Sequence, residues 1–199
     1  MSLFQNIIII MLLIAGAGFL SLSEIALAAA RKVKLKILAE SGEIRAQKVL
    51  DLQEQSADFF AASQIGLNAV AILGGILGEA AFRPFFVELI VQSYRGPWLE
   101  TIGFALSFTM VTSLFILFAD LMPKRLAMIA PEKIAISVIE PIQIFIRICK
   151  PLAWGINAIA NVLFRLFKVN TVRDDNMTFD DISAVMDAGA QAGVLQKQE

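Results

Sequence analysis

Three long apolar stretches dominate the pattern of hydrophobic and polar positions along this chain. They cover residues 7–30, 59–82 and 101–119. The first two each contain one charged residue, Glu24 and Glu79, and the third contains none. Because about 20 apolar residues cross the hydrocarbon core of a bilayer as an α-helix, the pattern predicts an all-α membrane protein. We expect its three transmembrane helices at about residues 5–30, 59–82 and 101–121.

The connection between the first two stretches, residues 31–58, mixes charges of both signs with apolar side chains. Its apolar positions include Val33, Ile37, Ile44 and Leu52. Such a mixture is typical of an amphipathic helical hairpin that rests under the membrane, with a turn at Ser41 and Gly42. The next connection, residues 83–100, predicts an interfacial aromatic cap. Its prolines and aromatic residues are Pro84, Phe85, Phe86, Tyr94, Pro97 and Trp98.

Prolines recur at regular intervals after the third stretch, at Pro131, Pro141 and Pro151. Since proline favours a helix start or a break, residues 131–168 predict a belt of short juxtamembrane helices. Within them, the uncharged run 151–164 is short for a span and is more typical of a re-entrant or interfacial segment. Residues 1–168 are therefore expected to form one transmembrane domain. Residues 169–199 predict the start of an acidic helical linker that leads to a further domain.

The basic residues are unevenly distributed between the connections. The first connection holds Arg31, Lys32, Lys34, Lys36, Arg45 and Lys48, the flank of the third stretch holds Lys124, Arg125 and Lys133, and the second connection holds Arg83 and Arg95. Cytoplasmic loops carry an excess of Lys and Arg, so we expect a multi-pass protein of a bacterial-type inner membrane, with its N-terminus outside and its C-terminus cytoplasmic. If residues 151–164 crossed the membrane, the C-terminal tail would instead lie outside.

The composition excludes several classes of function. Hydrophobic residues make up 57% of the chain and charged residues 18%, and the mean hydropathy is +0.71. The net charge of -1 suggests no nucleic-acid partner. The chain has no histidine and one cysteine, which argues against a Ser-His-Asp or Cys-His hydrolase and against sites for transition metals. No phosphate-binding glycine loop is present, so an enzyme is not expected.

Polar residues inside the apolar stretches are the candidate functional groups, because a charge in a span usually faces the bundle interior or a water-filled cavity. Hydroxyl, amide and carboxylate oxygens from three spans predict a site for a hard cation. Alternatively, the serine hydroxyls bond to carbonyls one turn earlier, the glycines serve helix packing, and Asp120 pairs with Lys124 or Arg125. The candidates are Ser21, Ser23 and Glu24 in the first span, Ser63, Gln64, Gly66 and Asn68 in the second, and Asp120 in the third.

Three motifs resemble the signatures of the CNNM/CorC (cyclin M) transmembrane domain: residues 21–27, 64–68 and 118–124. The resemblance implies a homodimer embedded in lipid, followed in the full-length protein by a cytoplasmic CBS-pair domain. It also implies export of Mg2+ as substrate, with Na+ as a candidate coupling ion. The cation ligands that the resemblance implies are Ser21, Ser23, Asn68 and Asp120, with the carbonyl of Gly66 as a further candidate. Glu24, Ser63 and Gln64 are secondary candidates.

Two positions depart from that family pattern: Ala17 stands where many relatives have serine, and Asp120 where most have glutamate. A lost hydroxyl and a shorter acid enlarge the cavity, and Mg2+ tolerates poor octahedral geometry badly. Residues 64–75 and 118–132 are more similar to the YtfL/PaeA-type branch, which is linked to export of cadaverine and putrescine. Because Mg2+ export is associated with the family more broadly, it is the main expectation, and polyamine export is its alternative. A third alternative is a membrane scaffold or sensor without transport.

Overall fold

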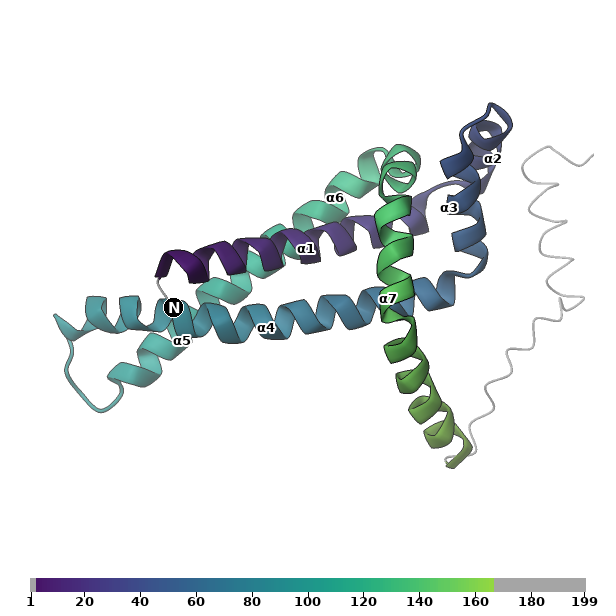
Figure 1. The fold of residues 1–199 in the computed structure, drawn as a ribbon. Coiled ribbons are helices and arrows are strands. Elements are labelled where there is room, and N and C mark those ends of the chain that lie inside the picture. The colour runs from purple at the N-terminus through teal and green to yellow at the C-terminus, as the bar shows by residue number, and fades with distance from the viewer. Residues whose placement is uncertain (1–2, 167–199) are drawn as a thin grey trace, which may run out of the picture. The chain divides into compact units, whose positions relative to one another are not determined.

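The computed structural model describes residues 3–166, and its regular structure over that range is helical throughout (Figure 1). The elements are α1 (Leu3–Ala29), α2 (Lys32–Glu40), α3 (Ile44–Glu54), α4 (Ser56–Val91), α5 (Leu99–Leu114), the π-helix η1 (Phe115–Leu121), α6 (Met122–Ile129) and α7 (Pro131–Leu166). The chain divides into two compact units, residues 1–156 and residues 157–199. The first contains every element up to the later turns of α7. The expected acidic linker, residues 169–199, lies outside the described residues.

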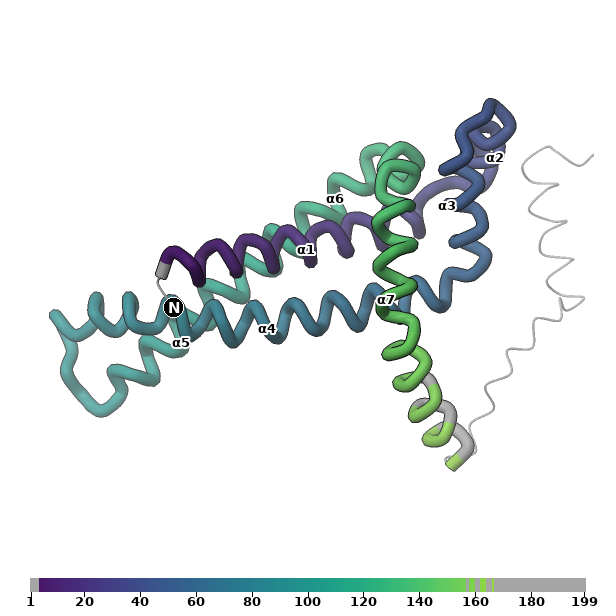
Figure 2. Tube along the Cα trace, viewed as in Figure 1, coloured from purple at the N-terminus to yellow at the C-terminus, as the bar shows by residue number. Residues whose placement is uncertain are grey.

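Three helical segments are long and apolar enough to cross a membrane, at Phe4–Ala29, Ser56–Val91 and Leu99–Ile129. The third comprises α5, η1 and α6 in one continuous rod. The tube in Figure 2 shows α4 running antiparallel to α1 and to α5, and α4 packs against both of them. The later part of the rod, η1 and α6, packs against α1. The all-α class and the three predicted spans are confirmed.

Small residues allow α4 to lie close to α5 and to the first residue of η1. A Cβ added to Gly78 would lie 2.5 Å from Val111 Cγ1, and one added to Gly74 would overlap the ring of Phe115. In addition, the Ser107 hydroxyl donates to the carbonyl of Glu79 at 2.9 Å. Lipid tails are as apolar as the side chains, so no hydrophobic driving force brings helices together inside a bilayer. Close packing of this kind is therefore a main source of helix association there. The glycines of the second span therefore include two that serve packing.

The predicted helical hairpin is present as α2 and α3, and Gly42 closes its turn with φ at +101°. One face of the hairpin is buried against the end of α1 and against α6 and α7. The buried side chains of this cluster are Ala26, Ala30, Leu35, Ala46, Val49, Leu50, Ala127, Ala135 and Ile139. Val33, Ile37 and Ile44 are exposed on the other side of the hairpin. Both faces of the hairpin thus carry apolar side chains.

A buried carboxylate fastens α7 to the basic end of the bundle. Glu132 accepts from Arg31 Nε at 3.2 Å and lies 3.6 Å from Lys34 Nζ. Burial raises the pKa of Glu132, but hydrogen bonds from its own backbone N–H and from Arg31, together with the charge of Lys34, outweigh burial and leave the pKa below its ordinary value. This carboxylate is therefore ionised, and its single negative charge is shared between two of the basic residues at this end.

Two sequence-based expectations need correction. The aromatic cap predicted over residues 83–100 is shorter, because α4 continues through Pro84 to Val91. The expected series of short helices after Pro131 is one helix, α7, which contains Pro141 and Pro151. Both of these prolines lie on the exposed side of α7. The opposite side buries Ala135, Val138, Ile139 and Ile142 at helical spacing, and this packing outweighs the hydrogen bonds that the prolines remove.

Candidate functional site

The candidate site forms where the rod of the third span changes its winding. In η1 the chain adopts a π-helix over Phe115–Leu121, which widens each turn by about one residue. Pro123, at the start of α6, contributes no backbone N–H, and Gly18 of α1 lies directly against this region. An added Cβ on Gly18 would lie 3.2 Å from the carbonyl oxygen of Phe118. The glycine thus lets the π-helix approach α1.

This close approach brings Asp120 against α1. The Ser21 hydroxyl donates to Asp120 Oδ1 at 3.2 Å, and Ser21 is completely buried. The same carboxylate oxygen lies 2.5 Å from Lys124 Nζ, one helical turn further along the chain. Asp120 therefore makes both of the interactions that the sequence offered as alternatives: it pairs with Lys124 and it faces a polar group of the first span.

Asp120 lines a cavity of about 310 Å³ that lies between α1, α4 and η1. The lining residues are Ala17, Glu24, Gln64, Leu67, Asn68, Ala71, Phe115, Ile116, Ala119, Asp120 and Lys124. Since about 10–15 Å³ of such space is enough for one water molecule, the cavity is larger than one bare metal ion needs. Its wall combines an apolar surface with two carboxylates, two amides and an ammonium.

Glu24 is the second carboxylate of this cavity. Its Oε1 accepts from Gln64 Nε2 at 3.2 Å, which links α1 to α4. Its Oε2 is buried and has no hydrogen-bond partner among the residues that the structure describes. A buried carboxylate oxygen without a donor is unfavourable by about 1–3 kcal/mol or more. Glu24 thus presents unused capacity to bind a cation.

The eight candidate residues fall into two groups. Four line the cavity, namely Glu24, Gln64, Asn68 and Asp120, and Ser21 adjoins it through its bond to Asp120. The other three face elsewhere. Ser23 donates to the carbonyl of Phe19 at 2.7 Å, as the alternative reading of its hydroxyl predicted.

Gly66 and Ser63 also lie away from the cavity lining. A Cβ on Gly66 would lie 2.6 Å from Phe145 Cζ of α7 and 2.8 Å from Leu20 Cδ1, so this glycine serves close packing. The Ser63 hydroxyl is buried, and no residue in the described part of the chain forms a hydrogen bond with it. A regular α1 helix places Ser21 and Ser23 about 200° apart, which explains why only one of the serines reaches Asp120.

The sequence did not identify every residue that lines the cavity. Lys124 was expected only as an interfacial partner of Asp120, yet it lines the cavity. The π-helix also escaped detection, because apolar periodicity does not distinguish it from an α-helix. Two features of the sequence could have indicated an irregular third span close to the first: Pro123 shortly after Asp120, and the small residues of α1 at positions 16–18.

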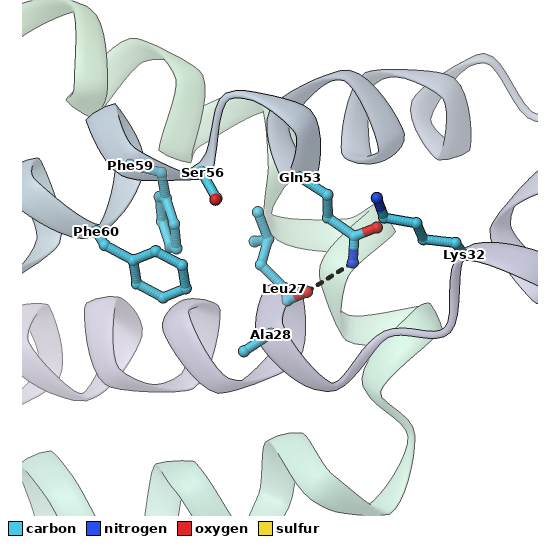
Figure 3. Close-up of a pocket in the computed structure, with 7 residues that line it drawn as sticks. All are labelled: Leu27, Ala28, Lys32, Gln53, Ser56, Phe59 and Phe60. Carbon is cyan, nitrogen blue, oxygen red and sulfur yellow. Dashed lines mark hydrogen bonds between the residues drawn. The ribbon is translucent and has the colours of Figure 1, made fainter. Parts of the chain in front are cut away.

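A second cavity, of about 300 Å³, lies beside the end of α1 and is shown in Figure 3. Gln53 of α3 reaches into it from above α1, and its Nε2 donates to the carbonyls of Leu27 at 2.7 Å and Ala30 at 2.9 Å. The last carbonyls of a helix lack intrahelical partners, so Gln53 caps α1. Phe59 and Phe60 form the opposite, apolar wall. This cavity serves the junction of the hairpin with the first span.

We expect Gln53→Leu to destabilise the protein by about 1–3 kcal/mol, because two helix-terminal carbonyls lose their donor in a partly buried position. The measurement is the midpoint of thermal unfolding in detergent micelles. Gln47→Leu is the matched control, since Gln47 is exposed and its side chain donates to Asp51 in the same helix. Equal midpoints for the two variants would contradict the capping role.

Comparison with known proteins supplies an independent line of evidence. The family model described as "Cyclin M transmembrane N-terminal domain" matches residues 8–199. The chain is 53% identical over 195 residues to the polyamine export protein of Escherichia coli strain K12, covering 98% of this chain and 44% of that protein. It is 56% identical over 195 residues to the polyamine export protein of Salmonella typhimurium, with the same coverage of both chains.

A relative with a lower identity carries the same name. The chain is 47% identical over 199 residues to the polyamine export protein of Haemophilus influenzae, covering 100% of this chain and 46% of that protein. This chain therefore spans less than half the length of the curated relatives that it matches.

Proposed function

Because this chain belongs to the family of Cyclin M transmembrane N-terminal domains, we propose that it forms the membrane-spanning part of an exporter of linear polyamine dications. The names of its relatives support polyamine export, which was the alternative expectation, over Mg2+ export, which was the main one. None of these names refers to magnesium.

The observation that carries this proposal is the mixed lining of the cavity. Glu24 and Asp120 supply two negative charges, and Ala17, Leu67 and Phe115 supply apolar surface to the same lining. An extended diamine has the complementary pattern, with an ammonium at each end and methylene groups between. Carboxylate, amide and hydroxyl oxygens accept hydrogen bonds from an ammonium without the octahedral geometry that Mg2+ requires. Ala17, which removes a hydroxyl from this wall, suits the methylene chain.

The proposal includes an orientation. The basic residues of the hairpin and of α6 and α7 gather at one end of the bundle, where Glu132 pairs with Arg31 and Lys34. The positive-inside rule assigns that end to the cytoplasm. The cavity then receives its substrate on the side where cytoplasmic polyamines are present. The implied homodimer, coupling by Na+ and a cytoplasmic CBS pair remain predictions.

The test uses the purified protein in liposomes loaded with radiolabelled cadaverine, putrescine or pentylamine, or with Mg2+ and a fluorescent indicator. We expect efflux of both diamines at least tenfold above that of protein-free liposomes. For the monoamine and for Mg2+, we expect little efflux beyond that of protein-free liposomes. Efflux of Mg2+ without efflux of diamines would show that the substrate is Mg2+ and would contradict polyamine export. Absence of all fluxes would favour a scaffold or sensor.

A further inference from the structure

The charges of the cavity do not match a dication in the conformation observed here. Its charged lining residues are Glu24, Asp120 and Lys124, which together carry a formal charge of -1. A diamine that entered this arrangement would leave one positive charge in excess. If Lys124 withdrew from Asp120, the two carboxylates would balance the two ammonium groups of the substrate.

Lys124 itself has the chemistry of half a substrate. A lysine side chain is a primary ammonium on a four-carbon stem, and a linear diamine is a primary ammonium on a similar stem. Lys124 Nζ lies 2.5 Å from Asp120 Oδ1, a short charge-assisted contact. The position that a substrate ammonium would take at Asp120 is thus already occupied by an ammonium of the protein.

The other carboxylate, that of Glu24, has one oxygen that no ammonium from the described residues occupies. Within residues 3–166, Glu24 Oε2 is buried without a donor, while Glu24 Oε1 accepts a hydrogen bond from Gln64. An ammonium that reached Glu24 Oε2, by moving the atoms that cover it, would satisfy this acceptor, whereas Asp120 Oδ1 is already paired with Lys124. Because Asp120 and Lys124 are each at least one third exposed in their side chains, their ion pair is weak enough to be exchanged.

From these three observations we infer that Lys124 is an internal competitor of the substrate, a conclusion that rests on the proposed polyamine transport. One ammonium of the diamine binds Glu24, and the other displaces Lys124 from Asp120. When Lys124 returns to Asp120, it expels that end of the substrate. Lys124 thereby lowers the affinity for diamines, favours their release, and makes occupation of Asp120 depend on a second ammonium in the same molecule.

Two substitutions test this role in opposite directions. Lys124→Met removes the competing charge and keeps the length of the side chain, so we expect cadaverine to bind about fivefold more tightly, which is the upper range for a partly exposed ion pair. The maximal rate of cadaverine efflux should fall, because the group that expels the substrate is missing. Lys124→Arg replaces the ammonium by a guanidinium that can pair with both carboxylate oxygens, and we expect weaker binding of cadaverine.

The measurements are calorimetric titration of the full chain in lipid nanodiscs with cadaverine, and efflux from liposomes over a range of internal cadaverine concentrations. Arg125→Met is the matched control, since it removes a neighbouring positive charge that does not line the cavity, and it should leave both values unchanged. If Lys124→Met unfolds, Lys124→Arg decides, and binding as tight as in the wild type overturns the inference.

The outcomes separate this inference from the proposed function. A wild-type protein that neither binds nor transports cadaverine overturns both. A wild-type protein that does so while Lys124→Met binds cadaverine no more tightly overturns only the role of Lys124. Tighter binding in both Lys124→Met and Arg125→Met assigns the effect to general electrostatics and likewise overturns it.

Discussion

Replacing Asp120 with asparagine is expected to reduce diamine efflux by about 10- to 100-fold. The substitution keeps the size of the side chain but removes one of the two anionic groups of the cavity, and it leaves the Lys124 ammonium without its partner. The side chain of Asp120 is 49% exposed, so the loss should be smaller than for a fully buried ion pair. The measurement is the initial rate of cadaverine efflux from liposomes with equal amounts of inserted protein.

The matched control for this variant is Asp58→Asn. Asp58 is an exposed acid in the first turn of α4 and does not line the cavity, so its loss removes the same charge from the chain without touching the site. We expect efflux within about twofold of the wild type for this control. If Asp120→Asn keeps more than half of the wild-type rate, the carboxylate has no part in transport.

The second large effect is expected from Gly18→Val, which should destabilise the protein by about 1–3 kcal/mol and reduce efflux severely. The first added carbon would lie 3.2 Å from a backbone oxygen of η1 and 3.3 Å from Pro123 Cγ. Neither neighbour is the flexible end of a side chain, so η1 must move away from α1. That movement would separate Asp120 from Ser21 and distort the cavity.

Gly16→Val is the control, because it introduces the same β-branched residue into the same helix where an added Cβ meets nothing within 4 Å. The difference between the two variants in unfolding midpoint, measured in one detergent, isolates the contact of α1 with η1. Similar midpoints and similar efflux for the two variants would show that the approach of the π-helix to α1 is not required.

Much of the fold could be predicted from the chain because membrane spans are coded by composition over long windows. Apolar stretches of the length of a bilayer, interrupted by Glu24 and Glu79 alone, predict three helices whatever their contacts. The turn of the hairpin was equally local, since Gly42 adopts a positive φ that other residues rarely take. The ends of α4 and the continuity of α7 were not local, because burial of Ala135, Val138, Ile139 and Ile142 holds α7 together despite its prolines.

The candidate site was predictable in its residue types but not in its grouping. The sequence alone determined that carboxylates, amides and hydroxyls lie within apolar spans, where polar groups are costly and seek one another. Only the tertiary structure decided which of them meet. The π-helix and the small surface of Gly18 bring Asp120 to Ser21, whereas the regular turn of α1 directs Ser23 to its own backbone. The structure also placed Lys124 in the cavity, because direction around a helix depends on winding and packing, which spacing along the chain does not encode.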